Sequence, residues 1–147
     1  MEQLLTQFLL RMIKNYYYLA AGILAIVFAV THALNGQNTV LPLLQVPSIT
    51  GETRSVFFYV WHIITAENFV FGMAFLYMAF QINQPKLMIA AFLIAALLII
   101  RWIVIFGTTL FYTPGALKNI LVDTIAIAIY VTLIILGTKA RAKHAKV

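Results

Sequence analysis

The sequence predicts an all-α polytopic membrane protein, a bundle of four transmembrane helices. Its 147 residues are 63% hydrophobic and only 10% charged. A soluble domain typically has about 45–50% apolar and about 25% charged residues, so the charged side chains of this chain cannot cover a soluble surface. Cysteine is absent, which excludes a disulfide scaffold. The density of large apolar residues excludes a disordered chain. We expect a single membrane domain over residues 1–147.

Four segments are apolar over the roughly 20 residues that a spanning helix needs. They cover residues 16–34, 56–80, 87–112 and 117–137. Asn35-Gly36 ends the first segment and is expected to form a left-handed C-cap. Turns that contain Pro85 and Pro114 separate the later segments. A basic tail, residues 138–147, follows the last segment.

Two regions outside the spans carry structural expectations. The apolar run after the amino-terminal 15 residues is too long for a signal peptide, so we expect no cleaved leader. Residues 3–10 fit either a short amphipathic helix on the membrane surface or a frayed start of the first span. The outer loop, residues 35–55, contains Pro42 and Pro47 among apolar residues, which favours a loop that dips into the interface or covers the outer end.

Lysine and arginine are distributed unevenly between the two sides of the predicted topology. Seven lie on one side: Arg11, Lys14, Lys86, Lys139, Arg141, Lys143 and Lys146. Only Arg54 and Lys118 lie on the other. Cytoplasmic loops carry the excess of basic residues, so both termini are predicted to be cytoplasmic. Next to a span, the basic tail is expected to contact anionic lipid headgroups, and no nucleic-acid partner is expected.

Ionisable side chains inside the predicted spans are the candidates for a functional site, because each costs about 2.5–3.5 kcal/mol on insertion scales. At about 1.5 Å of rise per residue, Glu67 and Arg101 lie roughly 16–17 Å from the outer ends of their helices. The same rise places His62 and Asp123 roughly 9–10 Å deep. His32 lies nearer the surface, roughly 3–5 Å in. All five therefore fall in the outer half or at the centre of the membrane.

A buried arginine needs a carboxylate partner, and we expect at least one ion pair with Arg101. Glu67 is the match in depth, and Asp123 is the rival. Asp123 is alternatively placed to accept a hydrogen bond from His62 or Trp102. The Glu67–Arg101 pair fits a fixed structural role and a site in a cavity equally well.

The two histidines of the spans have several interpretations. His62 and Thr65 are three residues apart and share one helix face, where polar residues join membrane helices. His62 then serves either as an interhelical hydrogen-bonding residue or as a ligand- or proton-binding residue, and His32 as an interfacial residue. Together with Glu67 and Asp123 they could hold a divalent metal, or bracket a haem between them. The spacing of known metal motifs is absent, so we expect no metal and no cofactor.

Three short elements resemble a group of small bacterial four-helix membrane proteins. They are Ala33-Leu34-Asn35-Gly36, Leu41-Pro42-Leu43-Leu44 and Tyr59-Val60-Trp61-His62-Ile63-Ile64-Thr65. In that group a glycine-containing outer loop with a Pro-Leu-Leu element precedes a helix that opens with Trp-His. The resemblance covers residues 33–65, implies a bacterial inner-membrane protein and directs attention to His62. It implies no activity.

These observations predict a protein that handles a small molecule, an ion or a proton through the polar cluster in the outer half of the bundle. A chain this short is small for a transporter, so a homodimer is expected. The alternative is a structural or accessory subunit whose partner in a larger membrane complex holds the activity. A third interpretation is a haem- or metal-binding redox subunit. The catalytic motifs of hydrolases, metalloproteases and nucleotide-binding enzymes are absent from the sequence, so we do not expect an enzyme.

Overall fold

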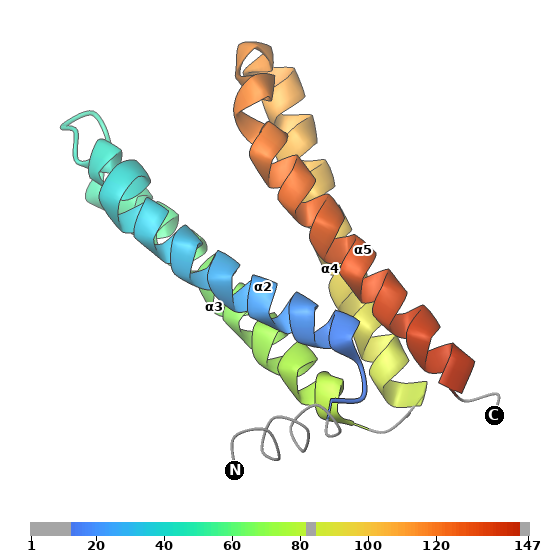
Figure 1. Ribbon diagram of the computed structural model, residues 1–147. Helices are drawn as coiled ribbons and strands as arrows, with labels where there is room; N and C mark the ends of the chain where they lie inside the picture. Colours follow the sequence, from blue (N-terminus) through green and yellow to red (C-terminus); the bar gives the residue numbers. More distant parts are fainter. Residues whose placement is uncertain (1–12, 82–84, 145–147) are drawn as a thin grey trace. The chain divides into compact units, whose positions relative to one another are not determined.

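The structure, a computed structural model, describes residues 13–81 and 85–144, and the side chains up to residue 140. Its long helices are α2 (Tyr16–Asn35), α3 (Gly51–Phe80), α4 (Pro85–Tyr112) and α5 (Leu121–His144), shown in Figure 1. Short helical segments are η1 (Gly36–Val40), η2 (Leu41–Leu44) and η3 (Pro114–Ile120). No strand occurs within these residues. Four helical stretches are long and apolar enough to cross a membrane. The all-α, four-span prediction is confirmed, and the chain is a multi-pass membrane protein.

The amino-terminal segment for which two conformations were considered, residues 3–10, lies outside the described part of the chain. The helices that follow run close to the predicted spans. α3 begins five residues before the expected position and is 30 residues long. α4 begins at Pro85, where the missing N–H of proline costs nothing because the first turn has no intrahelical partner for it. The fourth span starts with the 3-10 turn η3 and becomes an α-helix only at Leu121.

The predicted left-handed cap at Asn35-Gly36 is wrong. α2 continues through a π-helical turn, η1, and a 3-10 turn, η2, as far as Leu44. The backbone N–H of Leu41 donates to the carbonyl of Gly36, five residues back. In the described chain no glycine has a positive φ. Gly36 instead permits close contact, since a Cβ there would overlap the indole of Trp61.

The long outer loop predicted over residues 35–55 is also wrong, because most of it is helical. Only residues 45–50 connect η2 to α3. Thr50 precedes α3 as its N-cap, and its hydroxyl accepts a hydrogen bond from the backbone N–H of Thr53 at 3.2 Å. The non-helical connection is therefore six residues long, and the lid over the outer end stays a prediction.

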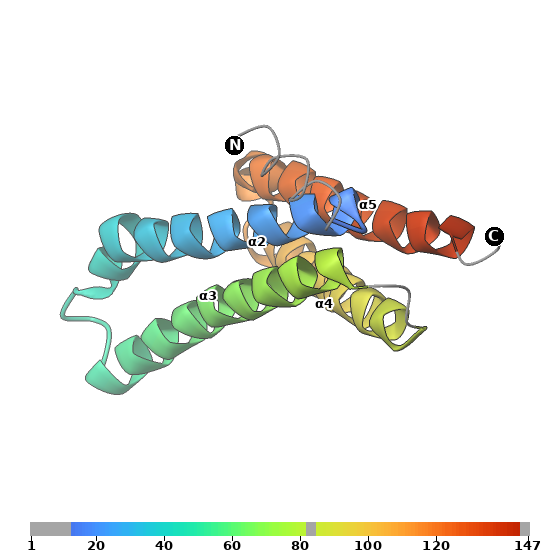
Figure 2. The same ribbon diagram turned by 60° about the horizontal axis from the view of Figure 1, so that its bottom comes forward.

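The chain forms two compact units. We call residues 22–74 the hairpin unit, which contains most of α2 and α3, and residues 13–21 with 75–144 the terminal unit, which contains α4 and α5. In the terminal unit α4 and α5 lie side by side and are joined by η3, as Figures 1 and 2 show. That the whole chain makes one membrane domain stays a prediction.

Small residues let the two helices of the hairpin unit approach each other. Gly22, Ala25 and Ala29 are buried and lie on one face of α2. Gly72 of α3 faces this stripe, and a Cβ on it would overlap Ile26 and approach the Gly22 carbonyl to 3.1 Å. Small residues at such positions are typical of membrane helices, whose association depends on close packing rather than on hydrophobic burial.

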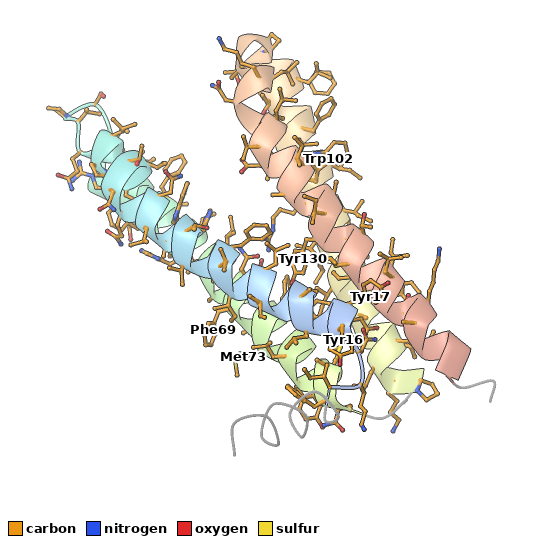
Figure 3. All side chains as sticks on the ribbon, viewed as in Figure 1. Tyr16, Tyr17, Phe69, Met73, Trp102 and Tyr130 are labelled. Atoms are coloured by element: carbon orange, nitrogen blue, oxygen red, sulfur yellow. The ribbon has the colours of Figure 1, made fainter. Side chains whose placement is uncertain are left out.

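The core of the terminal unit is built around aromatic rings. Tyr18, Phe75, Tyr130 and Ile134 are completely buried. The ring of Phe75 lies 5.5 Å from that of Tyr18 and 6.0 Å, edge to face, from that of Tyr130, which Figure 3 labels. Such tilted pairs are the favoured aromatic geometry. α4 adds a buried stripe at helical spacing, comprising Ala91, Ile94, Ala95 and Leu98.

Asn15 ties three helix ends of the terminal unit together. Its side-chain oxygen accepts a hydrogen bond from the backbone N–H of Tyr18 at 3.1 Å, as an N-cap of α2 does. Its amide nitrogen donates to the carbonyl of Gly137 on α5 at 2.9 Å. The backbone N–H groups of Lys14 and Asn15 donate to the carbonyl of Ala79 on α3, at 2.8 and 3.1 Å. Asn15 is 3% exposed, so these bonds are shielded from solvent.

Candidate functional site

Polar and aromatic side chains gather where α2 unwinds, in the hairpin unit. Trp61 of α3 is the centre of this group. Its ring stacks on the imidazole of His32, with ring centroids 4.3 Å apart and planes 8° from parallel. Its indole N–H donates to the backbone carbonyl of His32 at 3.0 Å. Gly36 packs against the same indole. Trp61 therefore contacts both α2 and its π-helical extension, and fixes α3 against the end of α2.

His62, the residue after Trp61, forms a hydrogen bond with a polar side chain of another helical segment. Its Nε2 lies 3.1 Å from Nε2 of Gln37 in the π-helical turn. In the tautomer whose ring proton lies on Nδ1, the amide N–H of Gln37 donates to this ring nitrogen. His62 is half-buried, whereas Gln37 is exposed. The ring of Phe58 lies 6.5 Å away, one turn earlier on α3.

The connection between η2 and α3 is held by a side-chain hydrogen bond. Arg54, in the first turn of α3, donates from Nε to the backbone carbonyl of Leu44 at 3.1 Å. Leu44 ends the 3-10 turn, where a carbonyl lacks an intrahelical partner. The arginine therefore caps η2 and holds the start of α3 to the end of the α2 extension. We name His32, Gln37, Trp61 and His62 the hairpin site.

The structure brings two of the six predicted residues, His32 and His62, into the hairpin site, where both flank Trp61. Thr65 follows on α3, but its hydroxyl donates to the carbonyl of Trp61 in its own helix, at 3.4 Å. The hydroxyl of Thr65 is therefore bonded within its own helix. Glu67 lies further along α3, with an exposed side chain.

Arg101 and Asp123 belong to the terminal unit. Arg101 lies half-buried on α4, and Asp123 is exposed in the first turn of α5. η3 precedes α5 without a break, so Asp123 is not at a free helix end, and its role stays a prediction. The ion pair of Arg101 with Glu67 joins residues of different units and stays a prediction.

The expectation that Asp123 accepts a hydrogen bond from Trp102 is wrong. The indole N–H of Trp102, which Figure 3 labels, donates to the hydroxyl of Thr124 at 3.1 Å. Thr124 in turn donates to the carbonyl of Ile120 at 2.8 Å. One residue along a helix is a turn of about 100°, so the neighbour of Asp123 faces α4. Helical phase therefore decides which residue of α5 is the partner of Trp102.

Sequence reasoning missed Gln37, because residues 35–55 were treated as a loop. Nothing in the pattern Gly-Gln-Asn-Thr-Val signals a π-helical turn, so no sequence feature could have found it. It also missed Asn15, although asparagine directly before an apolar helix is an N-cap signal. Sequence reasoning also missed Thr124, because it considered only the ionisable side chain of the adjacent Asp123.

A metal site was considered from the two histidines and two carboxylates. Within residues 13–81 and 85–144, no group of three or more His, Asp or Glu side chains is arranged to hold a metal ion. The histidines of the hairpin site instead face an indole and an amide. The arrangement can hold a proton or orient a small polar group on His62.

Comparison with known proteins gives no match of the chain to a family model, to a curated protein sequence or to a solved structure. The resemblance over residues 33–65 stays a prediction. What the chain's own geometry supports is a multi-pass membrane protein with a histidine–amide pair between two of its helices.

Proposed function

We propose that this protein handles protons in a bacterial inner membrane, with both termini in the cytoplasm and His62 as the proton-binding group. The observation that carries the proposal is the 3.1 Å hydrogen bond between Nε2 of His62 and Nε2 of Gln37. Imidazole is the side chain best suited to exchange a proton near neutral pH. Ionisable residues within membrane helices typically mark proton or ion pathways.

Glutamine is the partner that suits a changing protonation state. With a neutral ring protonated at Nδ1, the amide N–H of Gln37 donates to Nε2 of His62 across the 3.1 Å separation. When a proton binds to Nε2, the amide can turn by half a rotation and accept that proton's hydrogen bond through its oxygen. Neither state leaves Nε2 without a partner, and an unpaired polar atom in an apolar environment costs several kcal/mol. An acidic partner would instead favour only the charged ring.

The surroundings of the pair favour a fixed geometry. Trp61 is locked to His32 by stacking and by its hydrogen bond, so the backbone that carries His62 cannot rotate freely. Gln37 lies in a π-helical turn, a structure often found at functional sites. Its exposed side chain lets the pair exchange protons with whatever adjoins this end of the hairpin.

The proposal is tested by proton flux into liposomes. The purified chain is reconstituted with an internal pH-sensitive dye, and a potassium diffusion potential drives protons inward. We expect wild-type flux well above that of empty liposomes. His62→Gln should lower it by about 100-fold, the lower range for loss of a proton-transfer group. Thr65→Val, on the same helix, is the matched control and should leave flux unchanged, because its hydroxyl bonds only its own helix. Equal flux in wild type and His62→Gln would refute the proposal.

A second candidate is an accessory subunit or a homodimer, in which further helices cover the outward faces of this chain. Large apolar side chains are exposed along the spans, for instance Phe69 at 52%, Leu93 at 61% and Ile125 at 60%. Such faces can pack against other membrane helices as well as against lipid. This candidate predicts no proton flux from the isolated chain and the recovery of one stoichiometric partner, or of a dimer, in mild detergent.

A further inference from the structure

One end of the terminal unit carries a concentration of positive charge. In the described part of this unit, three lysines carry that charge: Lys14 shortly before α2, Lys86 in the first turn of α4 and Lys139 near the end of α5. The side chains of Lys14, Lys86 and Lys139 are described, and all three are exposed. We name these three lysines the basic end.

The fold holds the basic end together. The side chain of Asn15 donates a hydrogen bond to the carbonyl of Gly137 at 2.9 Å. Asn15 directly follows Lys14 in the sequence, and Gly137 lies two residues before Lys139. The start of α2 is therefore tied to the end of α5. α4 and α5 lie side by side and are joined at the opposite end by η3, so Lys86, in the first turn of α4, lies at the same end as Lys139.

Acidic side chains are few in the described part of the terminal unit. Residues 13–21, 75–81 and 85–140 contain one, Asp123. It is in the first turn of α5, whereas Lys139 is 16 residues further along, about 24 Å away at 1.5 Å per residue. Within this unit, positive side chains therefore predominate where three of the helices terminate.

Two tyrosines adjoin the basic end. Tyr16 and Tyr17 begin α2, directly after Lys14 and Asn15, and are 56% and 41% exposed. Figure 3 labels both at the start of this helix. Tyrosine is enriched where membrane helices meet the headgroup layer, since its ring is apolar and its hydroxyl polar. Lysines beside such rings lie at the depth of lipid phosphates.

We propose that the basic end binds the headgroups of anionic phospholipids. The positive charge is complementary to the phosphate, the tyrosines mark the headgroup depth, and the lysines are exposed on helices that cross the same membrane. Each lysine near an anionic surface contributes enough attraction to change affinity by about five-fold. The three described lysines together then account for about 100-fold.

The test uses the full chain in a non-ionic detergent, titrated with phosphatidylglycerol or with phosphatidylcholine, and native mass spectrometry counts the bound lipids. We expect the wild type to prefer phosphatidylglycerol. Lys139→Gln should weaken that binding about five-fold, and Lys14→Gln/Lys86→Gln/Lys139→Gln about 100-fold. Lys118→Gln is the matched control. It removes an exposed lysine of the same unit at η3, the other end of α4 and α5, and should leave affinity unchanged.

Several outcomes would overturn the proposal. Equal binding of the two lipids would show that the headgroup charge does not matter. An equal loss of affinity in the Lys118 and Lys139 variants would show that binding is not confined to the basic end. Displacement of phosphatidylglycerol by millimolar inorganic phosphate would indicate a site for free anions instead. Displacement by a short DNA duplex at lower concentration than lipid would indicate a nucleic-acid surface. Melting temperatures of all variants, measured in phosphatidylcholine, confirm that each variant is folded.

Discussion

Replacing Asn15 by leucine should destabilise the terminal unit by about 2–3 kcal/mol. The change keeps the side-chain volume but removes two hydrogen bonds of a residue that is 3% exposed. Loss of an N-cap costs about 1 kcal/mol and up to about 2. The bond from its amide to the Gly137 carbonyl joins α2 to α5, and interhelical bonds of this kind in membranes contribute about 0.6 kcal/mol on average and at most about 1.7.

Serine at the same position separates the two contributions. Asn15→Ser keeps an N-cap oxygen of nearly equal strength, but its short side chain cannot reach Gly137. We therefore expect about 1 kcal/mol of destabilisation, the interhelical share. The free energy of unfolding is measured by titrating the folded protein in mixed micelles with a denaturing detergent, followed by far-UV circular dichroism. Asn119→Leu, on the exposed face of η3, is the control and should have no effect. An Asn15→Leu loss below about 0.5 kcal/mol, the usual range for surface substitutions, would refute the role assigned to Asn15.

Two further predictions follow from contacts between helices. Gly36→Ala should cost about 1–3 kcal/mol of unfolding free energy, because the new Cβ overlaps the indole on which this glycine packs. Gly51→Ala, where a Cβ meets nothing within 4 Å, should cost nothing in the same measurement. Thr124→Val should cost about 0.6–1.7 kcal/mol through loss of the bond from Trp102, and a double-mutant cycle with Trp102→Phe should recover that coupling. Asp123→Asn should leave the coupling intact; its loss there would show that the carboxylate, and not the hydroxyl, receives the indole N–H.

The sequence predicts the class of this protein and the existence of its four helices, because composition and 20-residue apolar runs depend only on the membrane as a solvent. Helix ends are less predictable. Asn35-Gly36 has the composition of a left-handed cap, but the same glycine serves equally for close packing, and the indole that packs on it lies 25 residues away in the sequence. Local preference cannot distinguish these two uses.

The candidate site was found in part. His32 and His62 were identified because ionisable groups in spans are costly. Their partners were not, since Gln37 carries no charge and lies in a segment that has the composition of a loop. The choice of Thr124 over Asp123 depends on the phase of α5, which η3 sets by starting the α-helix at Leu121. A 3-10 turn of this kind leaves no periodic signal in the sequence.

The hydrogen bond between Gln37 and His62 is the central contact of the hairpin site. Magic-angle-spinning NMR of the ¹⁵N-labelled chain in lipid bilayers measures it, through a nitrogen–nitrogen correlation between the side-chain amide and the imidazole. The structure predicts a cross-peak for the 3.1 Å separation of these Nε2 atoms, and its disappearance in Gln37→Leu. A spectrum in which the His62 ring shows no correlation with Gln37, while the stacked pair of His32 and Trp61 is intact, would contradict the account.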